Sequence, residues 1–455
     1  MPPTWTTEQI LALAPDASSA KNGKGLATLR KWSNLGKTEH ALWGECQGSG
    51  SKPYQAQVDL TETGFKCSCP SRKFPCKHGL GLFLLYVTQP DAFTQNTPPY
   101  WVSNWITVRQ QQRAKKTESG QIADPLAQAK RAAKREEKVT AGIQQLDRWL
   151  RDLVRQGLAA LQTQPYSYWD AVAARMVDAQ APGLARQLRE MASIPHSGAG
   201  WQERLLERLG RMHLLIQGFQ RVETLPSPTQ ADIRTLIGWT QKEELASDPV
   251  ESDSACALLQ ADRTTQQQNT DHWLILGQRV EEQDNLRIQR TWLWGKDTQK
   301  AALVLSYAYG NQPLDTSLIP GTVIHAELGF FESAYPLRAL VKVRHSPAEA
   351  LRDMPGVEAI PEALSAYTKA LACHPWIEQF PLTLQAIIPL QHDDKWVVRD
   401  SAGYLLPITP HFEKGWQLLA ISGGHPVTVF GEWNGKAFLP LSALAEDKFI
   451  TFSSG

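Results

Sequence analysis

The sequence predicts an α+β multidomain fold: a small N-terminal ββα unit, a central all-α domain and a C-terminal mostly-β domain. Three observations lead to this prediction. A chain of 455 residues is too long for one hydrophobic core, since domains average roughly 150 residues. Cysteine and histidine cluster between positions 67 and 78. Apolar residues then follow a helical period from position 139 and form short strand-like runs from position 271.

The composition is that of an ordinary globular protein, with 42% hydrophobic and 20% charged residues. Because 47 Lys and Arg nearly balance 46 Asp and Glu, the net charge gives no indication of nucleic acid. Residues 1–8 lack the pattern of a secretory signal. The longest aliphatic run, 80–87, is less than half of the roughly 20 residues that a membrane helix needs. We therefore expect no membrane segment and a cytoplasmic location, where clustered cysteines favour metal over disulfides.

Four candidate metal ligands form two pairs, Cys67 with Cys69 and Cys76 with His78. In an extended segment, residues two apart project from one face, so both thiolates of the first pair can reach one point while Ser68 faces away. Residues two apart do not share a helix face, so the second pair is expected to straddle the start of a helix. Three thiolates and one imidazole complete a tetrahedral shell with no open position. The pattern therefore predicts one structural Zn²⁺ ion.

Four cations surround this predicted site: Lys66, Arg72, Lys73 and Lys77. Zinc with three thiolates carries one net negative charge. The cations could offset that charge and remain solvated, or they could contact a phosphate or an acidic partner. The sequence leaves both alternatives open.

The spacing Cys-x-Cys and then Cys-x-His resembles that of the SWIM zinc-finger family. Residues 43–50 and 53–54 before the site and 79–85 after it are also similar to this family, and residues 173–184 resemble its bacterial members. The resemblance implies a binding function, because fingers of this family are associated with DNA or protein interaction. For the bacterial members it also implies operation alongside a MoxR-type AAA+ ATPase and a von Willebrand factor A protein.

The N-terminal region, residues 1–97, is expected to contain this SWIM-type finger with its core at about 42–88. Residues 54–60 and 65–69 are predicted to be paired strands, and 80–87 a buried core helix. A unit of about 45 residues has a small core, and structural zinc can supply roughly 10–16 kcal/mol of apparent binding free energy. The unit should therefore not fold without metal.

Residues 98–138 are expected to form a basic linker and the lead-in to a helix. Nine cations outnumber four acidic residues here: Arg109, Arg113, Lys115, Lys116, Lys130, Arg131, Lys134, Arg135 and Lys138. The segment could be a solvated linker or a nucleic-acid contact. Aromatic stacking groups are not interleaved with the charges, which favours the linker.

An all-α domain is predicted for residues 139–245. One helical face carries an apolar stripe: Ile143, Leu146, Leu150, Leu153, Leu158 and Leu161. Further helical patterns occupy 169–179, 182–191 and 201–219. The polar segment 246–270 is expected to be a linker.

Residues 271–455 predict the β-rich C-terminal domain. Strand-like runs occur at 273–277, 291–295, 302–307, 323–328, 395–399, 416–421 and 427–433, with one helix near 361–372. Trp292 and Trp294 share one strand face, where they could form an inter-sheet core or a binding platform.

The sequence carries no motif for catalysis: no P-loop, no His-Glu-x-x-His and no Gly-x-Ser-x-Gly. We therefore expect that the chain is not an enzyme. The leading hypothesis is a zinc-binding adaptor that presents protein-binding surfaces. The alternative is a nucleic-acid-binding protein that uses Arg72, Lys73, Lys77 and the basic linker.

Overall fold

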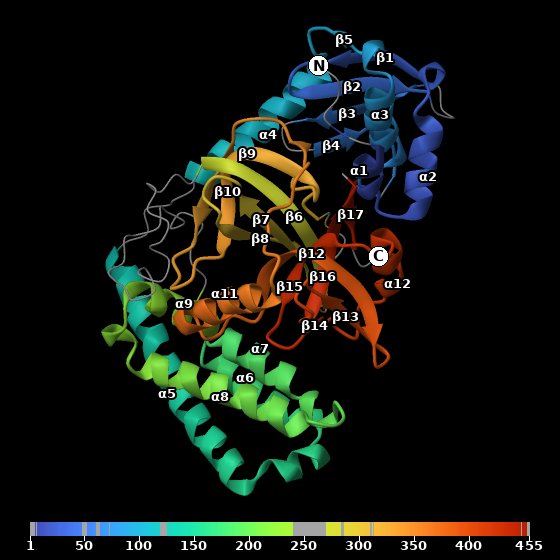
Figure 1. The fold of residues 1–455 in the computed structure, drawn as a ribbon. Coiled ribbons are helices and arrows are strands. Elements are labelled where there is room, and N and C mark those ends of the chain that lie inside the picture. Colours follow the sequence, from blue (N-terminus) through green and yellow to red (C-terminus); the bar gives the residue numbers. More distant parts are fainter. Residues whose placement is uncertain are drawn as a thin grey trace.

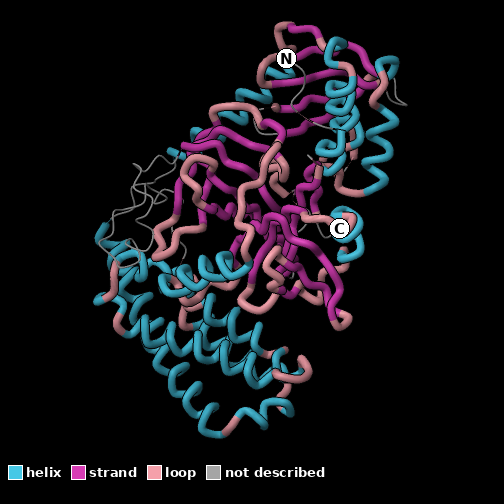
Figure 2. The backbone as a smooth tube through the Cα atoms, in the orientation of Figure 1, coloured by secondary structure: helices cyan, strands magenta, loops and turns pink. Residues whose placement is uncertain are grey.

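The computed structural model describes residues 5, 7–47, 52–60, 64–71, 73–118, 125–239, 270–283, 286–309, 312, 314–446 and 448–452. Figure 1 shows an N-terminal sheet with its helices at one end of the molecule and a bundle of helices at the other. The C-terminal strands lie between them, and Figure 2 shows this alternation of strand and helix layers along the backbone. The α+β multidomain prediction is confirmed.

Five strands form the N-terminal sheet, in the order β4-β3-β2-β1-β5. They are β1 (Trp32–Lys37), β2 (Ala41–Cys46), β3 (Tyr54–Asp59), β4 (Gly64–Cys67) and β5 (Thr94–Gln95). Neighbouring strands are antiparallel except β1 and β5. Helix α3 (Lys77–Thr88) packs against this sheet, and α1 (Thr7–Ala12) and α2 (Ala17–Leu26) pack against α3. Because α3 is enclosed in this way, every residue from His78 to Leu85 is buried.

The predicted ββα unit is present as β3, β4 and α3, but it belongs to a larger domain. Trp5, Ile10 and Trp32 share a buried cluster with Leu82 and Phe83 of α3. The expected core at 42–88 was therefore too small, because residues from both flanks complete it.

Residues 98–138, predicted as a basic linker and the lead-in to a helix, are helical over most of their described length. The segment contains α4 (Tyr100–Glu118) and the first part of α5 (Pro125–Gln156). The first turns of α4 place Trp101, Val102 and Ile106 against Ala41 and Trp43 of β2. These apolar residues anchor the start of α4. The charged residues that follow them made the segment resemble a linker in the sequence.

The helical domain contains α5, α6 (Tyr166–Asp178), α7 (Pro182–Met191), α8 (Trp201–Gln220) and α9 (Ser227–Ile237). The predicted stripe of α5 is buried from Ile143 to Leu153. Leu158 and Leu161 lie instead in a 3₁₀ turn, since Gly157 has a φ of 87° and ends the helix. The predicted helices at 169–179, 182–191 and 201–219 correspond to α6, α7 and α8.

Five strands of the C-terminal region close into a barrel. They are β6 (Thr270–Gln283), β7 (Leu286–Gly295), β8 (Ala301–Tyr309), β9 (Thr322–Phe330) and β10 (Arg338–Arg344). The order is β10-β8-β7-β6-β9, and β10 also pairs with β9, which closes the ring. β11 (Glu349–Ala350) pairs antiparallel with the start of β9. The predicted linker 246–270 lies outside the described residues, apart from Thr270, which begins β6.

A second sheet follows the barrel, in the order β14-β13-β12-β15-β16-β17. Its strands are β12 (Phe380–His392), β13 (Lys395–Arg399), β14 (Leu405–Pro407), β15 (Val427–Trp433), β16 (Phe438–Ala445) and β17 (Lys448–Thr451). The predicted helix near 361–372 is α11 (Ile360–Cys373). The predicted strand at 416–421 is wrong, because these residues form α12 (Gly415–Ser422). Gly423, with a φ of 58°, ends this helix in the left-handed region.

Trp292 and Trp294 form part of the core between barrel and second sheet. Trp292 is 1% exposed and packs in a cluster with Leu303, Phe430 and Leu441, with Trp294 against it. Its indole N–H donates to Glu432 Oε1 at 2.7 Å. The core alternative is therefore confirmed over the binding platform.

The helical domain docks against the C-terminal region beside α11 (Figure 1). The Trp376 indole N–H donates to the carbonyl of Arg211 in α8 at 3.0 Å. Asp232 of α9 accepts the N–H of Ala334 at 2.9 Å and lies 3.6 Å from His374 Nε2.

Candidate metal centre

The four predicted ligands come from the end of β4 and the start of α3. Cys67 is the last residue of β4, and Cys69 follows in a bend, so the strand is shorter than expected. Ser68 continues the ladder to β3: its N–H donates to Gln55 O at 3.0 Å and its Oγ accepts the Gln55 N–H at 2.9 Å. This pairing turns Ser68 toward β3 while its two neighbours supply thiols.

The second pair lies at the N-terminus of α3. Cys76 is the N-cap and His78 is in the first turn, as the spacing predicted. Both side chains are buried, and the His78 ring lies 4.9 Å from that of Tyr54 between centroids. The tertiary fold therefore fixes the direction of the imidazole.

The donor atoms of all four residues converge. Three Sγ atoms and one ring nitrogen lie within 4.8 Å of one another, and Cys67 Sγ is 3.8 Å from His78 Nδ1. Zinc–sulfur bonds of about 2.3 Å and zinc–nitrogen bonds of about 2.0 Å at tetrahedral angles place S and N about 3.5 Å apart. The cluster fits one structural Zn²⁺ ion.

The protonation of the thiols also suits a cation. Hydrogen bonds from Cys67, from His78 and from the Gly79 N–H lower the pKa of Cys76 to about 3. The hydrogen bond with Cys76 raises the pKa of Cys67, and burial raises that of Cys69. Three crowded thiols cannot all ionise without a positive charge between them, which a zinc ion would supply.

One of the four predicted surface cations is engaged within the protein. Lys73 Nζ lies 2.6 Å from Asp16 Oδ2. Asp16 caps α2 by accepting the Ser19 N–H at 2.7 Å, and its bond with Lys73 lowers its pKa to about 2. The zinc loop is thereby tied to the start of α2.

Lys66 and Lys77 are exposed beside the ligands. Neither has an ion-pair partner among the residues that the structure describes. Arg72 lies outside the described residues. Among the described residues, Lys66 and Lys77 therefore supply exposed positive charge at the metal centre that no ion pair within the protein offsets.

The basic stretch after the finger is only partly described, because the side chains of 110–133 lie outside the described set. Arg109 is 3.3 Å from Asp59 and stacks over Trp105. Arg135 stacks over Trp239 at 5.0 Å. Both of these cations therefore make contacts within the protein.

A second group of potential ligands, which the sequence did not suggest, lies at the start of the barrel. Asp271, His272 and Asp297 bring their donor atoms within 4.8 Å. Both oxygens of Asp271 already accept hydrogen bonds from the turn that includes Thr298, at 2.6–3.0 Å. This aspartate organises a turn, and the group does not resemble the thiolate cluster.

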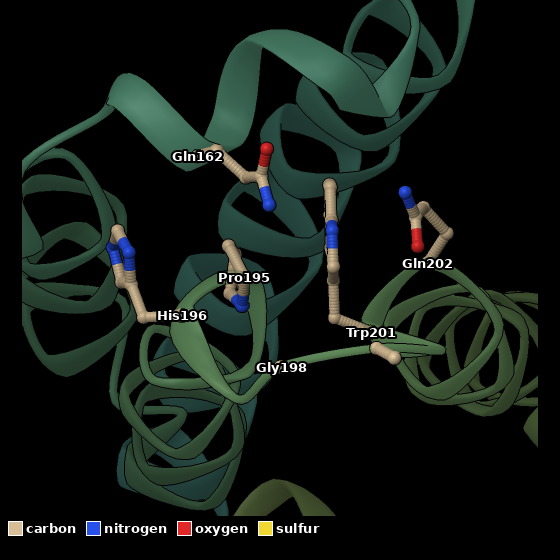
Figure 3. A pocket seen from close by; sticks show the side chains of 7 residues that line it. Gln162, Pro195, His196, Gly198, Trp201 and Gln202 are labelled. Carbon is tan, nitrogen blue, oxygen red and sulfur yellow. The ribbon is translucent and has the colours of Figure 1, made fainter.

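A hollow of about 580 Å³ opens in the helical domain between the 3₁₀ turn after α5 and the start of α8 (Figure 3). Gln162, Pro195, His196 and Trp201 face it in the close-up. His196 is the one titratable residue among those that line it. A lone imidazole lacks the acid, base or nucleophile partner that catalysis requires.

Comparisons with known families agree with the geometry. A family model described as the SWIM zinc finger matches residues 57–86, and one described as the SWIM-associated four-helix bundle domain matches residues 134–237. The first match contains all four ligands, and the second runs from α5 to α9. Searches of curated proteins and of solved structures returned no match. No described helix has the length and apolar character that crossing a bilayer requires.

Proposed function

We propose that this chain, a SWIM zinc-finger domain protein, is a zinc-stabilised adaptor that binds another protein through the surface around its metal centre. The observation that supports this best is the closed four-ligand cluster, which joins β4 to α3. Zinc with four protein ligands stabilises a fold and leaves no position for substrate. We infer a non-catalytic role on the same ground.

The surface chemistry favours an acidic partner. Lys66 precedes the first ligand in β4, and Lys77 lies between the last two ligands at the start of α3. Both lysines are exposed, and the metal would hold the two elements that carry them. Cations on a rigid backbone attract and orient an acidic surface without the cost of ordering the backbone that carries them. The family resemblance implies a partner class, a MoxR-type AAA+ ATPase with a von Willebrand factor A protein. We propose that the chain binds its partner in the cytoplasm.

An affinity capture from native cells at near-physiological salt, with and without nuclease, tests the proposal. The bait is the zinc-loaded chain, and the test variant is Lys66→Gln with Lys77→Gln. The matched control is Lys395→Gln, which removes an exposed cation from β13 in the second sheet. We expect the wild type and the control to capture the same protein, independent of nuclease, and the double variant to capture much less.

Identification of an AAA+ ATPase in the captured fraction would support the finer assignment. Capture that nuclease abolishes would point instead to nucleic acid. Equal capture by wild type and double variant would remove Lys66 and Lys77 from the interface.

A further inference from the structure

We propose that the outer face of β8 and β10 in the five-stranded barrel binds single-stranded nucleic acid. The groove on this face contains none of the four metal ligands, although it borders the zinc loop, and the inference does not rest on the adaptor function. It follows from the strand order, two exposed tyrosines, a row of cations and a groove.

The barrel has the strand order of an oligonucleotide/oligosaccharide-binding fold. Numbered one to five from β6, the strands run 1-2-3-5-4 around the ring, with the fourth pairing the first. All pairings are antiparallel except β8 with β10, the third with the fifth. Ligands of this fold lie across the second and third strands. Here Trp292 and Leu303 of those strands pack against the second sheet, and the exposed part of the face is the end of β8. Fold alone does not establish function, so the ligand is inferred from the side chains on this face.

Two tyrosines stand on the outer face of the third strand. Tyr307 is 53% exposed and Tyr309 is 64% exposed. They are two residues apart and therefore point to the same side of β8, while Ala308 between them is buried. Exposed rings at this spacing are stacking platforms for successive bases.

Cations also lie along the neighbouring strand. Arg338 and Lys342 of β10 flank Ala339 and Val341, which belong to the core cluster or pack against it, and Arg344 follows a bulge that shifts the alternation between Val341 and Val343. Internal contacts orient all three: Arg338 stacks over Phe331, Lys342 lies 3.7 Å from Glu327, and Arg344 donates to Ser317 O at 2.9 Å. A row of oriented cations beside aromatic rings matches a phosphate backbone with its bases.

A groove of about 570 Å³ runs between these two strands. It exists because the parallel pairing covers only Leu303–Val304 and Arg338–Ala339, so β8 and β10 are unpaired with each other beyond that point. Tyr307, Lys342 and Arg344 line it.

The N-terminal domain completes the groove. Arg109 of α4 and Phe74, which is 42% exposed in the zinc loop, also line it. Asp315 is the one carboxylate in the lining, against four Lys and Arg side chains, of which Arg109 and Lys342 are paired with Asp59 and Glu327. This excess of positive charge favours a polyanion over a neutral oligosaccharide.

Fluorescence anisotropy with labelled oligonucleotides of about 15 nucleotides tests the proposal. The probes are an oligothymidylate, an oligouridylate and a duplex of the same length, with a glutamate-rich peptide as the polyanion control. We expect a single strand to bind at about 50 mM salt and to weaken steeply by about 200 mM. The two single strands distinguish DNA from RNA.

Variants locate the binding face. Tyr307→Ala with Tyr309→Ala should weaken single-strand binding by at least about fivefold for each stacked base. The corresponding double change to Phe should retain affinity, because the rings remain. The matched control is Tyr404→Ala, which removes a ring that is 57% exposed outside the barrel. Lys342→Gln should lower the salt slope by about 0.7, whereas Lys395→Gln should not.

Three results would overturn the proposal. They are the absence of single-strand binding at low salt, unchanged affinity of the double tyrosine-to-alanine variant, and tighter binding of the glutamate-rich peptide than of either single strand. Circular dichroism and thermal midpoints equal to those of the wild type establish that each variant is folded.

Discussion

At the scale of single residues, Asp232 and His374 couple the helical domain to the C-terminal region. Asp232 is 6% exposed, and His374 Nδ1 is buried with no hydrogen-bond partner among the described residues. Burial raises the pKa of Asp232 and lowers the pKa of His374. The folded protein therefore binds the His374 proton less tightly than the unfolded chain does.

This difference makes stability depend on pH in a defined direction. As pH falls from about 7.5 to about 5.5, the unfolded chain takes up a proton at His374 before the folded protein does. The free energy of unfolding of the wild type should therefore decrease more than that of His374→Gln. Urea unfolding of zinc-loaded protein at both pH values measures this.

His392→Gln is the control, because it removes an exposed histidine of β12. It should retain the pH dependence of the wild type. A His374→Gln protein with an unchanged pH dependence would show that the buried imidazole does not carry the effect.

The zinc ligands could be predicted residue by residue because their chemistry is local. Cys67, Cys69, Cys76 and His78 lie within a short segment at pairwise spacing. The ion-pair partner of Lys73 could not be predicted from the sequence. Asp16 lies far upstream and reaches the zinc loop because α2 packs on α3.

At the scale of elements, the close packing of α2 on α3 depends on two glycines. A Cβ at Gly81 would lie 2.7 Å from Leu26 Cβ, and one at Gly23 would lie 2.9 Å from Leu80 Cβ. Such distances require backbone movement, because both partners are Cβ atoms. The packing of α2 on α3 positions α3, and the N-terminus of α3 carries Cys76 and His78.

Replacing Gly81 with Ala should therefore destabilise the protein. Overpacking costs about 1–3 kcal/mol, which exceeds the gain of up to about 1 kcal/mol in helix propensity. We expect the free energy of unfolding of the zinc-loaded protein to fall by about 1–2 kcal/mol in denaturant titrations.

Gly25→Ala is the matched control in α2, since nothing lies within 4 Å of a Cβ there. It should leave stability unchanged or raise it by up to about 1 kcal/mol. Equal effects of the two substitutions would show that the helices do not depend on close approach at Gly81.

Helices with a long amphipathic period were predictable, and short apolar runs were not. α5, α7 and α8 follow their apolar periods closely. Residues 416–421 contain so few polar positions that a strand and a helix fit equally well. Gly423 and Gly424, which come after Ser422, were the signal for a helix end.

At the scale of the whole molecule, the closure of the barrel was beyond prediction from one sequence. β10 pairs with both β8 and β9, and β9 pairs back with β6. Such non-local pairings are selected by the competition among many possible registers rather than by local pattern. For the same reason, the sequence did not predict that β5 completes the N-terminal sheet, because β5 lies far from its partner β1 in sequence.

At the same scale, the zinc ligands join β4 to α3 within the N-terminal domain, and the helical domain has its own core. Removing one ligand should therefore unfold one part of the molecule and leave the other. Structural zinc can contribute roughly 10–16 kcal/mol of apparent binding free energy at neutral pH, so its loss is not offset by packing alone.

The most direct measurement is zinc content per chain, combined with hydrogen exchange across the sequence, for Cys69→Ala and for Cys46→Ala. Cys46 is a buried thiol of β2 outside the ligand set and serves as the matched control. We predict one zinc and full protection in the wild type and in Cys46→Ala. In Cys69→Ala we predict loss of zinc and of protection in β3, β4 and α3, with α5–α8 still protected. A zinc-replete and fully protected Cys69→Ala protein would contradict the account.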